Sequence, residues 1–139
     1  MELGVLVKIL KHLKNNELDV VFREYDGQKL VISLAGRIAS SFSNRLLDTK
    51  EEPGYTQFVL APPKPRERII VDFRELEYIN SIGAAILMRF YSILKKQPTK
   101  LYLVFETDSE VAFIMETLGF FLAAKSALVW NSLETALTK

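Results

Sequence analysis

Hydrophobic and polar residues alternate in two neighbouring runs near the start of the chain. Every second residue is apolar in both runs: Leu18, Val20 and Phe22 in the first, Leu30, Ile32 and Leu34 in the second. A period of two is typical of strands with one buried face. Between the runs, Asp26-Gly27 suits the left-handed positions of a tight turn. The pattern therefore predicts a β-hairpin.

The residues ahead of this hairpin have a different period. Four leucines follow helical spacing, with lysines on the other side: Leu3, Leu6, Leu10 and Leu13 against Lys8, Lys11 and Lys14. The spacing predicts an amphipathic helix over residues 2–14, which also contains His12, within an N-terminal segment of residues 1–16. Two placements fit it: packing on the domain or on a second copy, and lying on a membrane surface as a basic amphipathic helix.

A helix and an insertion are predicted between the hairpin and the next strand. Ser40 or Ser41 can cap a helix that carries Phe42, Leu46 and Leu47. Residues 50–67 then hold Pro53, Gly54, Pro62, Pro63 and Pro65, which exclude a regular helix. We expect this segment to be an ordered but mobile insertion, because so long a connection is uncommon in a compact domain.

The second half of the chain alternates apolar runs with helical ones. Ile69–Phe73 is nearly continuously apolar, which indicates an inner strand ending at Asp72-Phe73, with Glu75 and Glu77 in a surface loop beyond it. A helix opens at Asn80-Ser81 and ends at Gln97-Pro98; Ile82, Ile86, Phe90 and Ile93 recur along it at helical spacing.

Two more strand–helix pairs follow. Leu101–Phe105 reads as a buried strand, and Thr107 with Glu110 matches a capping box for a helix that ends at Gly119. Ala127–Trp130 predicts a last short strand with Trp130 in the core, and Asn131 or Ser132 caps a terminal helix. The order β-β-α-β-α-β-α-β-α predicts an α/β fold for residues 17–139, with a mixed sheet that is partly parallel.

Composition narrows the classes of function. A chain of 139 residues is the size of one domain, and its formal charge of +1 argues against a nucleic-acid partner. The absence of cysteine excludes disulfides, thiolate nucleophiles and cysteine-based zinc sites. No apolar run approaches the roughly 20 residues of a membrane span, and the amino terminus lacks the pattern of a signal peptide. We therefore expect a cytoplasmic protein.

Residues 68–83, which read RIIVDFRELEYINSIG, resemble the centre of the STAS domain found in anti-sigma-factor antagonists, stress-signalling scaffolds and sulfate transporters. The motif there is an apolar strand ending in Asp, a short loop and Asp-Ser-[Ser/Thr]-Gly at the head of a helix. The element order and the Leu118-Gly119-Phe120 step also match. The resemblance implies a protein-interaction module that binds an anti-sigma factor, a serine kinase or another regulatory protein, with a homodimer also open.

The resemblance also implies a site. The serine after the motif's Asp, which a partner kinase phosphorylates in some members, corresponds to Ser81. The implied partner-binding residues are Arg37, Ala39, Ser40, Asn80, Ser81, Ile82 and Gly83. Asn80 and Ala39 replace two acidic residues of the family pattern, and Arg37 replaces a Glu. From the residues alone, Ser81 is either a helix cap or a phosphorylation switch, and Asn80 can itself cap the helix.

No pattern indicates an enzyme. Asp72 closes a strand, and Glu75 and Glu77 lie in the predicted surface loop. No glycine-rich phosphate loop precedes a helix, and no histidine or aspartate accompanies a serine in a nucleophilic arrangement. We expect no catalytic residues, metal or cofactor. The alternative function from another class is a soluble STAS subunit of a membrane transport system, or a scaffold that is not phosphorylated.

Overall fold

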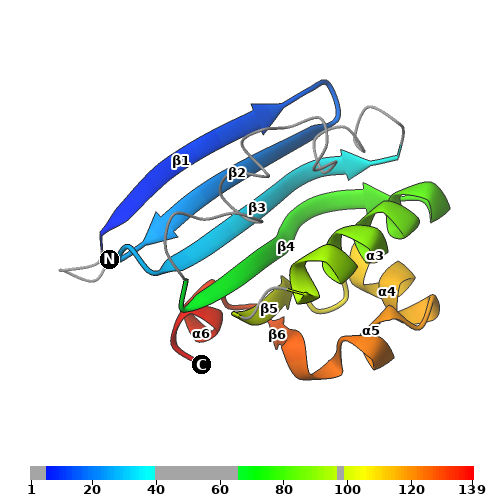
Figure 1. The fold of residues 1–139 in the computed structure, drawn as a ribbon. Coiled ribbons are helices and arrows are strands. Elements are labelled where there is room, and N and C mark those ends of the chain that lie inside the picture. The colour runs from blue at the N-terminus through cyan, green and yellow to red at the C-terminus, as the bar shows by residue number, and fades with distance from the viewer. Residues whose placement is uncertain (1–5, 40–65, 97–98) are drawn as a thin grey trace.

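The structure, a computed structural model, describes residues 6–39, 66–96 and 99–139, apart from the side chain of residue 86. Its strands are β1 (Val7–Lys14), β2 (Leu18–Tyr25), β3 (Lys29–Ile38), β4 (Arg68–Ile79), β5 (Lys100–Phe105) and β6 (Leu128–Trp130). Its helices are α3 (Ser81–Lys95), α4 (Glu110–Thr117), α5 (Phe120–Ala123), the short 3₁₀ helix η2 (Lys125–Ala127) and α6 (Leu133–Thr138). The strands form one six-stranded sheet in chain order (Figure 1).

The sheet has an antiparallel half and a parallel half. β1 pairs with β2, and β2 with β3, in antiparallel fashion, whereas the β3–β4, β4–β5 and β5–β6 pairs are parallel. The predicted hairpin is confirmed. Asp26 and Gly27 between β2 and β3 have φ of 55° and 73°, the left-handed values that a tight hairpin turn requires. The predicted mixed α/β sheet is therefore correct.

Alternate side chains of the inner strands enter two separate cores. One core joins residues such as Ile32, Val71 and Phe105 to α3, α4 and α5. The other joins Val31, Ile70, Val104 and Val129 to Ala136 of α6. Figure 1 shows α3, α4 and α5 on one face of the sheet and α6 at the other. Because β4 and β5 are covered on both faces, the near-continuous apolar runs that predicted them are explained.

The helix predicted over residues 2–14 is wrong over Val7–Lys14, which form β1. The pairing register with β2 shifts between Ile9 and Lys11, which marks a β-bulge at Leu10. The extra residue lets Leu10 and Leu13, three apart, both approach the core, and this spacing imitates a helix. Asn15 then closes the turn to β2 by accepting hydrogen bonds from the N–H groups of Glu17 and Leu18, both at 2.9 Å. His12 accordingly lies on this edge strand.

Strand β4 is longer than predicted. It continues past Phe73 to Ile79, so Glu75 and Glu77 lie in a strand and not in a loop. Leu76 and Ile79 are buried, while Glu75 and Glu77 face solvent. Two register shifts against β3, after Ser33 and after Gly36, keep β4 paired along this length. The polar residues between the apolar ones suggested a loop, but they occupy the open side of a paired strand.

Several local predictions were correct in kind and displaced in position. Ser109 caps α4 instead of Thr107, accepting a hydrogen bond from the N–H of Ala112 at 3.1 Å. Gly119 follows that helix with φ of 79°, as expected of a C′ glycine, and Ser132 caps α6.

The buried face of α3 consists of Ala84, Leu87, Phe90 and Leu94, so Ile82, which was predicted on that face, lies outside the core. Trp130 was predicted to lie in the core, but it is 42% exposed, so that prediction is wrong.

The predicted helix with Phe42, Leu46 and Leu47 lies outside the described residues, as does the insertion up to Pro65. Arg66 and Arg68, just beyond it, are both buried. Arg66 pairs with Glu24 of β2 at 2.6 Å. Arg68 donates from Nη1 to the carbonyl oxygens of Ala136 and Lys139, at 2.8 and 3.1 Å. The start of β4 is thereby tied both to β2 and to α6.

Candidate functional site

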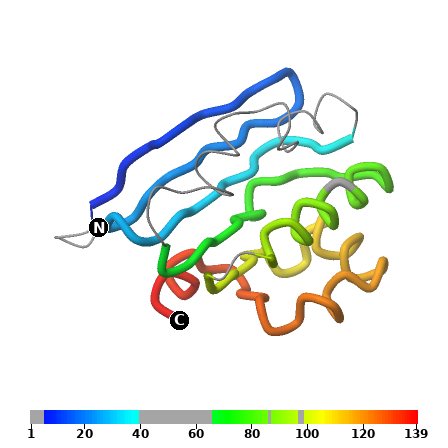
Figure 2. The backbone as a smooth tube through the Cα atoms, in the orientation of Figure 1, coloured from blue at the N-terminus to red at the C-terminus, as the bar shows by residue number. Residues whose placement is uncertain are grey.

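The ends of β3 and β4 lie beside the first turn of α3. The two strands are parallel, and the register pairs Arg37 with Tyr78 and Ile38 with Ile79. The chain then enters α3 directly after Ile79, as the trace in Figure 2 shows. In α/β folds, the carboxyl ends of parallel strands are the edge at which ligands and partners are usually received. This edge is therefore the first place to look for a site.

Asn80 joins the two segments with both ends of its side-chain amide. Its Oδ1 accepts a hydrogen bond from the N–H of Gly83 at 2.8 Å, which caps α3. Its Nδ2 donates to the carbonyl oxygen of Ala39 at 3.2 Å, beyond the end of β3. A carboxylate in this place would accept the first bond but has no proton to donate for the second. The asparagine thus holds the loop after β3 against the start of α3.

Gly83 lets α3 approach the end of β3. A Cβ atom at this position would overlap the carbonyl oxygen of Ile38 and crowd that residue's side chain. Only glycine permits so close an approach of helix and strand backbone. Tight packing within the domain therefore accounts for this glycine, and the residue is buried.

Ser81 and Ile82 are exposed at the first turn of α3. Ser81 is the first helical residue and not the cap, because Asn80 holds that position. Within the described residues, the N–H groups of Ser81 and Ile82 have no hydrogen-bond acceptor, as expected for the first turn of a helix. Ile82 is 58% exposed, a large apolar side chain at the head of a helix. The cap explanation for Ser81 is thus wrong.

Arg37 is exposed next to this turn. Its guanidinium lies 4.5 Å from the centre of the Tyr78 ring on the neighbouring strand. Its backbone N–H donates to the carbonyl oxygen of Glu17 at 2.8 Å, which fixes the end of β3 against the start of β2. The backbone that carries the Arg37 guanidinium is therefore held in place by hydrogen bonding.

Six of the seven residues proposed from the sequence come together here. We call them the β3–α3 surface: Arg37, Ala39, Asn80, Ser81, Ile82 and Gly83. Ser40, the seventh, lies outside the described residues. The surface consists of one cation, two polar side chains and small or apolar residues, without a carboxylate. A partner would contact one positive charge, one hydroxyl group and an exposed apolar side chain on this surface.

Asp72 is held in an internal ion pair. Its carboxylate is buried and accepts from Nε and Nη2 of Arg74, both at 3.0 Å, and from the Arg74 backbone N–H at 3.1 Å. The hydrogen bond to Asp72 raises the pKa of the Arg74 guanidinium, and partial burial opposes it. Two fixed bonds to one guanidinium make Asp72 a structural residue. The described residues contain no cluster of histidine and acidic side chains suited to a metal ion.

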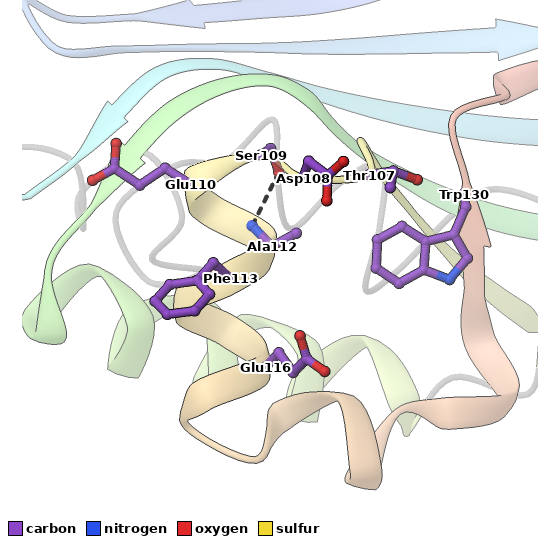
Figure 3. Close-up of a pocket in the computed structure, with 8 residues that line it drawn as sticks. All are labelled: Thr107, Asp108, Ser109, Glu110, Ala112, Phe113, Glu116 and Trp130. Carbon is purple, nitrogen blue, oxygen red and sulfur yellow. Dashed lines mark hydrogen bonds between the residues drawn. The ribbon is translucent and has the colours of Figure 1, made fainter.

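A cavity of about 690 Å³ lies elsewhere, between α4 and β6 (Figure 3). Phe113 and Trp130 both line it; Figure 3 shows Phe113 to the left of α4 and Trp130 to the right, with Asp108 near the start of the helix and Glu116 lower on it.

Sequence reasoning missed this cavity. Phe113 had no predicted role, and Trp130 was predicted in the core. The pairing of β6 with β5, and the hydrogen bonds between Thr107 and Asn131, place Trp130 beside the start of α4. No spacing in the sequence predicts that Phe113 and Trp130 line one cavity.

Comparison with known proteins agrees with the fold. The family model described as the STAS domain matches residues 27–136. The fold is similar to an anti-sigma factor antagonist from Mycobacterium paratuberculosis, at TM-score 0.58 and 19% identity, covering 96% of this chain and 92% of that one. It is also similar to a sulfate transporter family protein from Wolinella succinogenes, at TM-score 0.56 and 15% identity, covering 77% of this chain and 80% of that one. A search of curated proteins found no match.

The helices of the described ranges were also compared with the requirements of a membrane span. None of them is long and apolar enough to cross a bilayer.

Proposed function

The chain belongs to the STAS domain family, and from this we propose that it is a non-enzymatic regulatory module whose protein partner docks on the β3–α3 surface. The observation that carries the proposal is the exposure of Ser81 and Ile82 on a rigid support. Asn80 and Gly83 fix the turn from within, so the backbone that carries the two exposed side chains loses little conformational freedom on binding. Pre-organised exposed apolar and polar groups of this kind suit a protein interface.

We further propose that the partner is an anti-sigma factor with serine-kinase activity, and that Ser81 is its substrate. The kinase would transfer the γ-phosphoryl group of ATP to Oγ of Ser81, with ADP leaving and the hydroxyl proton passing to the kinase's base. The phosphate would lie near the N–H groups of Ser81 and Ile82 and the positive end of the α3 dipole. The domain would therefore tolerate it, while about −1.5 to −2 units of new charge would enter the docking surface.

The test is to isolate the partner from the native cell and measure its affinity for three proteins: wild type, Ser81→Asp and Ser81→Ala. We expect Ser81→Asp to bind at least tenfold more weakly and Ser81→Ala to bind as well as wild type. Ser92→Asp is the matched control, because Ser92 is exposed near the other end of the same helix. Cooperative thermal unfolding of all four proteins, with midpoints that differ by no more than a few degrees, shows that each is folded. Wild-type affinity of Ser81→Asp would refute the phosphoserine switch.

A second candidate function is a soluble subunit of a membrane transport complex. It is favoured by the amide of Asn80, which donates to Ala39, a bond that the acidic residue of the family pattern cannot make. The surface would then be a constitutive interface and Ser81 only an exposed contact. Under this function, the isolated partner would be a transporter subunit, and Ser81→Asp would reduce its binding no more than other single substitutions in the surface.

A further inference from the structure

From the cavity between α4 and β6 we infer a second docking site, which receives an arginine- or lysine-bearing segment of a protein partner. This inference does not rest on the function proposed for the β3–α3 surface, since the two sites share no residue. It rests on three observations: two exposed aromatic rings, a rim that carries only negative charge, and a rigid framework.

The aromatic rings face an open space. Phe113 is 68% exposed and Trp130 is 42% exposed, and both line the cavity (Figure 3). Burying such large rings is favourable, and their faces attract cations. Within the described residues, the indole N–H of Trp130 has no acceptor, so it can donate to a peptide carbonyl. The opening thus offers contacts for an arginine or lysine side chain and for the backbone that carries it.

The charge around the cavity has one sign. Asp108, Glu110 and Glu116 contribute to its lining, and none of the lysines or arginines that the structure describes does. In the described part of the chain, none of these carboxylates forms an ion pair. The whole sequence is nearly balanced, with 18 basic and 17 acidic residues, so this is a local segregation of charge. An apolar opening with an acidic rim is complementary to a basic segment.

The framework is fixed before any partner arrives. The N–H of Thr107 donates to Oδ1 of Asn131 at 2.7 Å, and Nδ2 of Asn131 donates to Oγ1 of Thr107 at 2.7 Å. Trp130 is braced by the ring of Phe121, edge to face at 5.5 Å. The end of β6 is therefore locked to the loop before α4. A pre-organised site loses less entropy on binding than a mobile one.

The degree of exposure favours a segment of a macromolecule over a free small cation. Small ligands are usually buried over most of their surface, and a cavity with such exposed rings does not enclose one. A side chain carried by a larger partner needs only an open cleft, because the partner itself excludes the water. We therefore assign the site to a protein segment.

The chain carries its own reporter for the test, because Trp130 is the only tryptophan. Its fluorescence is followed while a short peptide of alternating arginine and alanine is added. The control peptide replaces arginine with citrulline, which has nearly the same shape and no charge. We expect a saturable change with the arginine peptide alone, weakening as salt is added because exposed charges are screened. Equal binding of the citrulline peptide, or no saturable change, would overturn the inference.

Substitutions of lining residues test whether the peptide binds in this cavity. Phe113→Ala should weaken it by about threefold to tenfold, the range of one cation–aromatic contact. Asp108→Asn combined with Glu116→Gln should weaken it further, and asparagine accepts the left-handed φ of 64° at position 108. Matched controls are Leu122→Ala, 84% exposed on α5, and Glu134→Gln on α6, neither of which lines the cavity. Unchanged affinity of Phe113→Ala would refute the site.

Two further outcomes are decisive. If free arginine amide binds as tightly as the peptide, the site takes small cations and the assignment to a protein segment is wrong. If the protein associates with itself and Glu116→Gln abolishes this, the occupant is a second copy and the partner is not another protein. Ser81→Asp should leave peptide binding unchanged, so failure here and failure of the proposed function are separately visible.

Discussion

The side chain of Asn80 donates a hydrogen bond to the carbonyl oxygen of Ala39 at 3.2 Å, while its other end caps α3. One residue therefore controls both the start of the helix and the position of the chain beyond β3. The STAS motif that the sequence resembles has an acidic residue in this place, which can cap but cannot donate. The substitution changes how the β3–α3 surface is held together, and it can be tested directly.

We expect Asn80→Ala to lower the free energy of unfolding by about 1–2 kcal/mol, since both bonds are lost. Asn80→Asp should cost less, about 0.5–1 kcal/mol, because the carboxylate still caps the helix and favours its dipole. Urea unfolding of the three proteins measures the order. No loss for Asn80→Asp would show that the bond to Ala39 does not stabilise the fold, and a larger loss for Asn80→Asp than for Asn80→Ala would contradict the capping role.

Gly83→Ala should destabilise the protein by about 3 kcal/mol, because the new methyl group meets the backbone of Ile38. Helix propensity alone predicts the opposite sign, a gain of about 1 kcal/mol. Ala85→Gly is the matched control on the exposed side of the same helix and should cost about 1 kcal/mol. Thermal unfolding distinguishes the two effects, and a stabilised Gly83→Ala protein would contradict the close approach of α3 and β3.

Ser81→Ala should change the free energy of unfolding by less than about 0.5 kcal/mol, as is usual for an exposed residue without partners. The reason is that Asn80 caps α3 and the Ser81 hydroxyl makes no hydrogen bond within the described residues. Ser109→Ala is the comparison: it removes a true cap and should cost about 1 kcal/mol. Equal losses for the two serines in chemical denaturation would restore a capping role for Ser81.

Arg68→Met should loosen α6. The guanidinium donates to the carbonyl oxygens of Ala136 and Lys139, and methionine keeps the apolar stem while removing the donors. We expect a loss of about 2 kcal/mol and faster amide exchange across Leu133–Thr138. Arg89→Met, an exposed arginine on α3, is the control and should leave exchange in α6 unchanged. Unaltered protection of α6 in Arg68→Met would mean that packing alone holds it.

The sequence predicted correctly those strands and turns that are marked by a pattern within their own residues. The hairpin followed from alternation and from Asp26-Gly27, and the buried strands followed from apolar runs, because each pattern reflects the strand's own burial. Strand β1 was mistaken for a helix because the bulge at Leu10 places two leucines three apart on one side. Only its pairing with β2 reveals the strand, and that pairing is tertiary.

The β3–α3 surface could be predicted from the sequence in part, whereas the cavity between α4 and β6 could not. The resemblance pointed to the residues that meet at the β3–α3 surface, but it did not decide which of two neighbouring polar residues caps the helix. Asn80 is the cap of α3, and the same side-chain amide also donates a hydrogen bond to the carbonyl oxygen of Ala39. The cavity between α4 and β6 could not be predicted, since Phe113 and Trp130 come to line one cavity only through the tertiary arrangement of α4 and β6.

The division of the sheet into antiparallel and parallel halves has a consequence for how the chain folds. The β2–β3 pair closes across a tight turn, and such hairpins form in about 1–10 μs. The β3–β4 pair must instead bring together strands separated by residues 39–67, whose closure carries a larger entropy cost. We expect the hairpin to assemble early and β3–β4 docking to limit the folding rate. Shortening that connection should therefore speed folding while leaving the unfolding rate nearly unchanged.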